Sequence, residues 1–115
     1  MSWNKEWIAE ELRAGVARVL RDDVTDPRVS LVTLIRVDLA PDLSQAFVYW
    51  SPLETKNAAD VEEIERGLKS ASSFVRRRLA SQLKLRRMPA LDFRYDAAFE
   101  AGARTLELLS SVRDE

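Results

Sequence analysis

The sequence predicts an α+β domain in which a three-stranded sheet has helices packed on one face. Two β-branched segments with alternating hydrophobicity, joined by a turn, lie between stretches whose apolar residues recur at helical spacing. A third alternating segment, LDFRY, follows Pro89 and precedes a last helical stretch. The length of 115 residues suits one domain, so residues 1–115 are expected to form a single unit.

The first helix is expected from Asn4 to about Asp22. Its apolar residues share one side at helical spacing: Ile8, Leu12, Val16, Val19 and Leu20. Asn4 suits the N-cap position, because its side chain can accept a hydrogen bond from the first turn. Pro27 cannot continue a helix and biases Asp26 away from helical angles, so the helix must end before this pair.

Residues 29–52 are expected to form a β-hairpin around the turn segment APDLS. In the first strand, residues 29–39, alternation places four side chains on one face: Leu31, Ile35, Val37 and Leu39. In the second strand, QAFVYWS, it places Phe47 and Tyr49 on one face and opposite them Ala46, Val48 and Trp50. Phe47 and Tyr49 could stack on nucleobases, but a partly exposed sheet face is the more frequent role of such residues.

A second helix is expected after the potential N-cap Asn57, with four acidic residues in its first turns. The apolar period nearly runs through to Leu83, so one long helix is possible. The small residues 70–73 compete for backbone hydrogen bonds and favour a break or kink, giving a kinked helix–helix pair that ends before Pro89. Residues 91–95 then form the third strand and residues 97–109 the last helix.

The composition excludes several chemistries. Without cysteine or histidine the chain has no thiol nucleophile, imidazole base, Cys/His zinc site or disulfide framework. We therefore expect no catalytic residue, cofactor or metal, and no enzymatic activity. The N-terminal segment is charged and lacks the apolar core of a signal peptide, and no apolar run could cross a membrane. A soluble, cytoplasmic protein is expected.

Positive charge is concentrated in residues 69–87, which we call the basic segment. It contains seven basic residues and no acidic one, although the whole chain has a net charge of −1. The rest of the chain contains 11 basic and 19 acidic residues, a net charge of −8. A helical face exposed only to solvent usually mixes both signs and gains ion pairs. Phosphate binding is the simplest reason to accept the self-repulsion.

On a helical wheel, Ser73 and Ala80 fall among the clustered cations Arg76, Arg77, Lys84 and Arg87, opposite the apolar Val75, Leu79 and Leu83. Arg78 and Arg86 lie at the edge of the apolar face, where a long side chain can bury its stem. The predicted RNA-binding residues are Lys69, Ser72, Ser73, Arg76, Arg77, Lys84, Arg86 and Arg87.

Three alternatives stay open for the basic face. It could be an ordinary charged surface neutralised by the acidic second helix. It could belong to an RNA-binding module with another target, or to a protein–protein adaptor that meets an acidic partner. Two helices that meet at small residues, followed by a basic helix against a sheet, are a layout seen in RNA-binding domains. The Gly-x-x-Gly loop of the K-homology module is absent here.

The chain resembles the ribosome-binding factor A family over about residues 7–109. The matching residues appear in the same order and spacing: Asp26-Pro27-Arg28, Val32-Thr33, Pro41-Asp42-Leu43-Ser44, Val48-Tyr49, the stretch SASSFVRRRLASQLKLRRMPALDFRYD, Gly102-Ala103-Arg104 and Leu108-Leu109. The chain departs from the family pattern at Ser73, where the family has the glycine of its kink, and at Thr105, where isoleucine is usual.

The resemblance implies a K-homology-like fold of the second type, with an Ala-x-Gly kink in place of the glycine loop. It also implies a cytoplasmic factor, monomeric when free, that binds the small (30S) ribosomal subunit. Such a factor assists late assembly of the subunit and 16S rRNA maturation. The resemblance further suggests a link to growth at low temperature.

Overall fold

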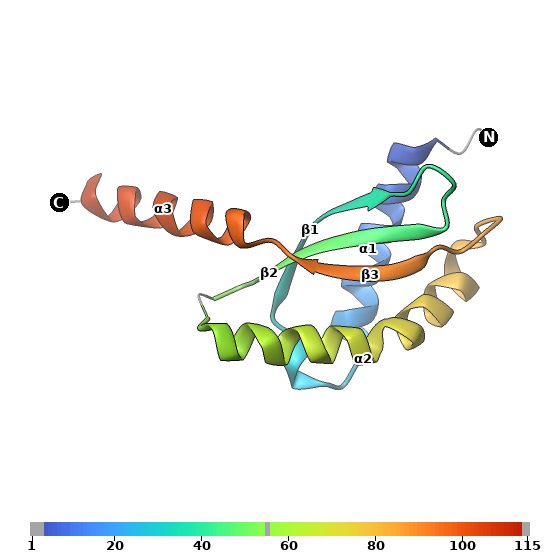
Figure 1. The fold of residues 1–115 in the computed structure, drawn as a ribbon, viewed down its shortest axis with the longest axis horizontal. Coiled ribbons are helices and arrows are strands. Elements are labelled where there is room, and N and C mark those ends of the chain that lie inside the picture. Colours follow the sequence, from blue (N-terminus) through green and yellow to red (C-terminus); the bar gives the residue numbers. More distant parts are fainter. Residues whose placement is uncertain (1–3, 55, 114–115) are drawn as a thin grey trace.

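The computed structural model describes residues 4–54 and 56–113. The elements follow in the order α1 (Lys5–Asp22), the short 3-10 helix η1 (Pro27–Val29), β1 (Val32–Leu39), β2 (Gln45–Pro52), α2 (Ala58–Leu83), β3 (Ala90–Tyr95) and α3 (Ala97–Arg113). The three strands form one sheet in the order β1-β2-β3. β2 pairs antiparallel with β1 and parallel with β3, and α2 makes the crossover between the two parallel strands (Figure 1).

One face of the sheet packs on α1 and α2, and the core lies between these layers (Figure 1). Ala46, Val48 and Trp50 of β2 are completely buried there, as the alternation predicted. The helices contribute several fully buried side chains to the same core: Leu12, Val16 and Val19 from α1, and Leu68, Val75 and Leu79 from α2. The predicted three-stranded α+β architecture is therefore confirmed.

The helix starts are the local features that the sequence predicted best. The Trp7 N–H donates to Asn4 Oδ1 at 2.7 Å, and the Asp60 N–H donates to Asn57 Oδ1 at 2.9 Å. Both asparagines have extended backbone angles, as N-cap residues do. These caps satisfy backbone donors that have no partner within the helix, so they define where α1 and α2 begin.

Strand β1 differs from the prediction at its start and in its buried face. Residues 27–29 form η1, and the strand begins only at Val32, which leaves Leu31 56% exposed. The pairing of β1 with β2 shifts register between Leu34 and Arg36. This β-bulge brings Leu34 and Val37 into the core, while Ile35 is only half-buried. The expected common face of Leu31, Ile35, Val37 and Leu39 is thus wrong.

The predicted break between Ser70 and Phe74 is also wrong. Helix α2 is one helix of 26 residues, and in Figure 1 its axis changes direction along its length without an interruption. The Ser72 hydroxyl donates to the carbonyl of Lys69 at 2.9 Å, so it shares a backbone acceptor instead of displacing the helical hydrogen bond. Such back-bonding bends helices and does not break them.

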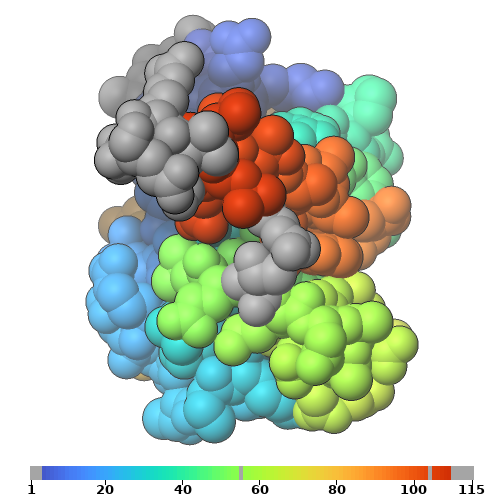
Figure 2. Space-filling model, turned by 90° about the vertical axis from the view of Figure 1, so that its left-hand side faces the viewer, coloured from blue at the N-terminus to red at the C-terminus, as the bar shows by residue number. Residues whose placement is uncertain are grey.

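Among the described residues, helix α3 contacts only the end of the sheet next to β2, while α1 and α2 are the helices that cover its face. It leaves the end of β3 and projects away from the other elements, so the molecule measures 53 × 30 × 22 Å (Figure 1). Figure 2 looks onto this end, where α3 stands above the first turns of α2. Phe99, Leu106, Leu108 and Leu109 are therefore exposed. Within the described ranges, no helix has the length and apolar character needed to cross a bilayer.

Candidate nucleic-acid interface

The basic segment is divided between a helix and a loop. Residues 69–83 belong to α2, and the helix ends at Leu83 because Lys84 adopts a left-handed conformation with φ of 49°. The expected helical face that joined Arg76, Arg77, Lys84 and Arg87 is therefore wrong. Arg86 and Arg87 lie in the loop between α2 and β3, beyond the end of the helix. The positive charge forms a strip along α2 that continues over this loop.

Most cations outside the basic segment are neutralised by carboxylates. Seven described side chains form ion pairs of this kind: Arg13 with Glu10, Arg21 with Asp22, Arg28 with Asp26, Arg36 with Asp38, Lys56 with Glu54, Arg66 with Glu63 and Arg94 with Asp92. The guanidiniums lower the pKa values of several of these carboxyl groups, among them Glu10, Asp22 and Asp26. The charge of each of these cations is balanced by a neighbouring carboxylate.

The basic segment shows the opposite pattern. Six of its seven cations are exposed and form no ion pair with any described residue: Lys69, Arg76, Arg77, Lys84, Arg86 and Arg87. The acidic first turns of α2 do not neutralise them, since Glu63 pairs with Arg66 and Arg28. Exposed cations that no carboxylate compensates are what phosphate binding requires. The sequence also allowed a basic face neutralised by the acidic second helix, but the described residues form no such ion pairs with these cations.

Arg76 has a structural role that the sequence did not reveal. Its Nε donates to the carbonyl of Pro89 at 3.1 Å, and its Nη2 donates to the carbonyl of Met88 at 2.7 Å. These bonds tie the α2–β3 loop back onto the helix. Arg76 was expected to extend freely into solvent, so this expectation is corrected, and its guanidinium has fewer donors left for a phosphate.

Arg78 is the member of the basic segment that forms an ion pair. Its Nε lies 3.2 Å from Asp23 Oδ2, next to the end of α1, and its guanidinium lies over the Phe74 ring at 5.6 Å. It stabilises the contact between α1 and α2. The sequence placed Arg78 at the edge of the apolar face, and the structure confirms that position.

Ser72 and Ser73 lie on different sides of α2. Lys69 and Ser72 border a groove between α2 and β3, whose far wall is formed by residues 91–95. Ser73 is exposed and lies one turn before Arg77, so it shares the outer surface with that cation. The small side chains of both serines leave room for a backbone to approach α2 between Lys69 and Arg77.

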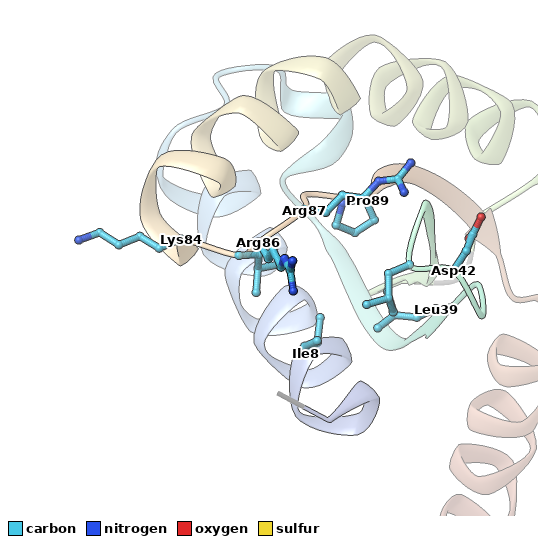
Figure 3. Close-up of a pocket in the computed structure, with 9 residues that line it drawn as sticks. Ile8, Leu39, Asp42, Lys84, Arg86, Arg87 and Pro89 are labelled. Carbon is cyan, nitrogen blue, oxygen red and sulfur yellow. The ribbon is translucent and has the colours of Figure 1, made fainter. Parts of the chain in front are cut away.

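The loop part of the basic segment borders a hollow of about 850 Å³, which we call the loop hollow. Three elements surround it: the start of α1, the β1–β2 turn and the α2–β3 loop (Figure 3). It is lined by the apolar Ile8, Leu39, Leu43, Leu85 and Pro89 and by the charged Asp42, Lys84, Arg86 and Arg87. In Figure 3 the Lys84 side chain extends away from the other labelled residues. The sequence missed this site, because it depends on two loops that are far apart in the chain.

The open face of the sheet is not available for stacking. The guanidinium of Arg36 lies over the Tyr49 ring at 4.0 Å, and that of Arg94 lies over the Phe47 ring at 4.9 Å. Both arginines also pair with aspartates of their own strands, Asp38 and Asp92. This face is therefore partly exposed and internally neutralised, which favours the structural role of Phe47 and Tyr49 over base stacking.

The chain is similar to proteins of one known family. The family model described as ribosome-binding factor A matches residues 4–109. The chain belongs to the ribosome-binding factor A family. The family member from Dechloromonas aromatica is 40% identical over 102 residues, which cover 89% of this chain and 80% of the relative. The member from Carboxydothermus hydrogenoformans is 38% identical over 114 residues, or 99% of this chain and 90% of the relative.

Solved structures of the ribosome-binding factor A family share the fold. The crystal structure of the Thermus thermophilus protein is 27% identical, with a TM-score of 0.69, and the match covers 81% of this chain and 97% of that one. A model of the Thermus thermophilus factor, fitted into a cryo-EM map of its complex with the 30S subunit, is 28% identical with a TM-score of 0.61 and coverage of 77% and 91%. The K-homology-like fold expected from the resemblance is confirmed by these relatives.

Proposed function

We propose that this protein binds the free 30S ribosomal subunit through the basic segment and assists its late assembly and 16S rRNA maturation. In this proposal the protein is a cytoplasmic monomer when free. It acts by binding and does not catalyse a reaction. Growth at low temperature, where RNA rearrangement is slow, is the condition under which we expect the cell to depend on it most.

The observation that supports the proposal is the contrast between paired and unpaired cations. Lys69, Arg77, Lys84, Arg86 and Arg87 are left without ion pairs in a chain whose other described cations mostly lie beside carboxylates. The 30S complex of the Thermus thermophilus factor supports the small subunit as the RNA target. Phosphate contacts give affinity without sequence preference, so selectivity must come from the fit to a folded rRNA surface.

The test is co-sedimentation with ribosomal particles on sucrose gradients at low salt. We expect the protein in the fractions of free small subunits and not in polysomes. The double variant Arg77→Glu/Lys84→Glu should leave those fractions, because it reverses two unpaired cations of the basic segment. Arg76 is left unchanged, since its hydrogen bonds to the α2–β3 loop would confuse binding with folding.

The matched control is Arg13→Glu/Arg21→Glu on α1. It makes the same change of net charge on two cations that are paired in the structure. Exposed ion pairs contribute little to stability, so this variant should fold and still co-sediment. Equal loss of binding in both variants would mean that net charge alone governs association. Retained binding of the Arg77→Glu/Lys84→Glu protein would refute the assignment of the interface.

A further inference from the structure

We propose that the loop hollow takes an unstacked nucleotide of the small-subunit RNA, with its base inside and its phosphates on the α2–β3 loop. This inference rests on the proposed function and names a second part of the same interface. It places a base-binding site at the C-terminal end of α2, beyond the phosphate-binding strip along the helix.

The lining of the loop hollow combines apolar walls, which suit a base, with cations, which suit phosphates. Five apolar side chains from three elements form its walls: Ile8, Leu39, Leu43, Leu85 and Pro89. Such walls exclude water from an inserted base without specifying its identity. Arg86 and Arg87 border the hollow, and the Lys84 side chain extends from its edge into solvent (Figure 3). These cations are placed for the phosphates on either side of the inserted base.

The backbone around the hollow is strained. Leu43 and Lys84 have φ of 62° and 49°, and no other non-glycine residue in the described part of the chain has a positive φ. Both line the loop hollow, although they are 41 positions apart in the sequence. Bulky residues rarely adopt this conformation, and such strain collects at ligand-binding sites. The fold therefore maintains the shape of this hollow against local backbone preference.

Two observations favour a nucleotide over an acidic peptide. The cations at the hollow belong to the basic segment, so an RNA strand that contacts Arg77 on α2 passes next over Lys84 and the loop. The hollow also contains Asp42, whose pKa is lowered mainly by the hydrogen bonds that it accepts from Ser44 and, more weakly, by Arg87. A carboxylate can accept a hydrogen bond from the exocyclic amino group of a base, a donor that the acidic side chains of a peptide lack.

The experiment uses the full chain bound to 30S subunits and short-wave ultraviolet light, which crosslinks any of the four bases to a side chain that it contacts. Mass spectrometry of the digested protein locates the attached residues. We expect crosslinks within residues 39–43 and 84–89, because a base lies inside the hollow. Crosslinks confined to residues 69–80, with co-sedimentation intact, would overturn this inference and leave the proposed function standing. Failure of the unaltered protein to co-sediment would overturn both this inference and the proposed function.

A variant measures the contribution of the apolar wall. Leu85→Gln should weaken binding to free small subunits about tenfold, because it replaces an apolar side chain that the base would cover, and should abolish the crosslinks at residues 39–43. Leu53→Gln is the matched control, since Leu53 is 60% exposed and lies after β2, away from the hollow. Circular dichroism checks that both variants fold. The crosslinks on the unaltered chain decide the question even if Leu85→Gln fails this check.

Two other combinations of the crosslinking result and the affinity of Leu85→Gln would also decide the question. Weaker binding of Leu85→Gln without crosslinks at the hollow in the unaltered protein would assign the site to a protein segment of the subunit and overturn the nucleotide. Unchanged affinity and unchanged crosslinks in Leu85→Gln would mean that the base passes over the hollow without entering it, which also overturns the inference.

Discussion

Neighbouring cations of the basic segment have different roles. Lys84 has two, one that favours binding and one, in ending α2, that costs stability. Its ammonium group extends into solvent, where a phosphate can reach it, while its backbone adopts the left-handed conformation that ends α2. Glycine is the usual residue at such a position, because it lacks the Cβ atom that makes the conformation costly. A lysine there costs stability, and we attribute its presence to the phosphate contact proposed for its ammonium group.

Lys84→Gly should therefore change stability and binding in opposite directions. We expect the free energy of unfolding to rise by about 1 kcal/mol, since the left-handed strain is relieved. Affinity for free small subunits should fall, because one unpaired cation is lost. Denaturant titration and quantitative co-sedimentation measure the two effects.

Lys84→Ala separates the two contributions. It removes the same charge but keeps a Cβ atom, so it should lose affinity without gaining stability. A Lys84→Gly protein that is less stable than the parent would contradict the backbone argument. One that binds as tightly as the parent would remove Lys84 from the interface.

At the scale of elements, the position of the basic segment depends on the packing of α2 against α1. Gly15 is the contact point: a Cβ atom built there would lie 2.6 Å from Leu79 Cδ2, and Leu79 is completely buried. Arg18 and Gln82 form a hydrogen bond of 2.8 Å three residues further along each helix. The close approach aligns the two helices and presents the outer face of α2, with Ser73 and Arg77, to solvent.

Gly15→Ala should lower the free energy of unfolding by about 2 kcal/mol, because the added methyl group forces the completely buried Leu79 to shift. The matched change is Gly102→Ala in α3, where an added Cβ meets nothing within 4 Å. That variant should be as stable as the parent or more stable by up to about 1 kcal/mol, as alanine favours a helix interior. Thermal and denaturant unfolding measure both, and equal effects would contradict the packing argument.

At the scale of the whole molecule, charge is distributed along the long axis. The acidic first turns of α2 and the projecting α3 lie at one end, and the loop hollow lies at the other (Figure 1). The chain outside the basic segment has a net charge of −8, so an RNA would be repelled by most of the surface and attracted by one strip. Such a molecule approaches RNA in one orientation, which favours a single site over general coating of RNA.

This distribution predicts how binding depends on salt. Affinity for free small subunits should fall as salt rises, with a slope set by the number of phosphates contacted. Arg77→Ala should weaken binding and reduce that slope by about one contact. The adjacent Arg78→Ala is the control, because Arg78 already pairs with Asp23 and should leave the slope unchanged. Identical slopes for Arg77→Ala and the parent would exclude Arg77 from phosphate contact.

Local patterns were enough to predict much of the fold. The caps Asn4 and Asn57 and the buried face of β2 depend on interactions within a few residues, so composition and spacing indicate them directly. The bulge near Ile35 depends on how β1 pairs with β2. The position of the α2–β3 loop depends on Arg76, which binds carbonyls 12 and 13 residues further along the chain. The residue pattern within one segment cannot predict the β1–β2 pairing or the hydrogen bonds of Arg76, because both join segments that are apart in the sequence.

The sequence by itself determined that positive charge gathers in residues 69–87, because charge is a property of composition and needs no coordinates. Only the tertiary structure decided which of these charges a partner can use. Folding placed Asp23 beside Arg78 and the carbonyls of Met88 and Pro89 beside Arg76, and it left Arg77 and Lys84 in solvent. It also closed the loop hollow from Ile8, Leu43 and Leu85, residues that are distant in sequence. The physical reason is that ion pairs, hydrogen bonds and hollows depend on the distances between side chains in space. Long-range packing determines those distances.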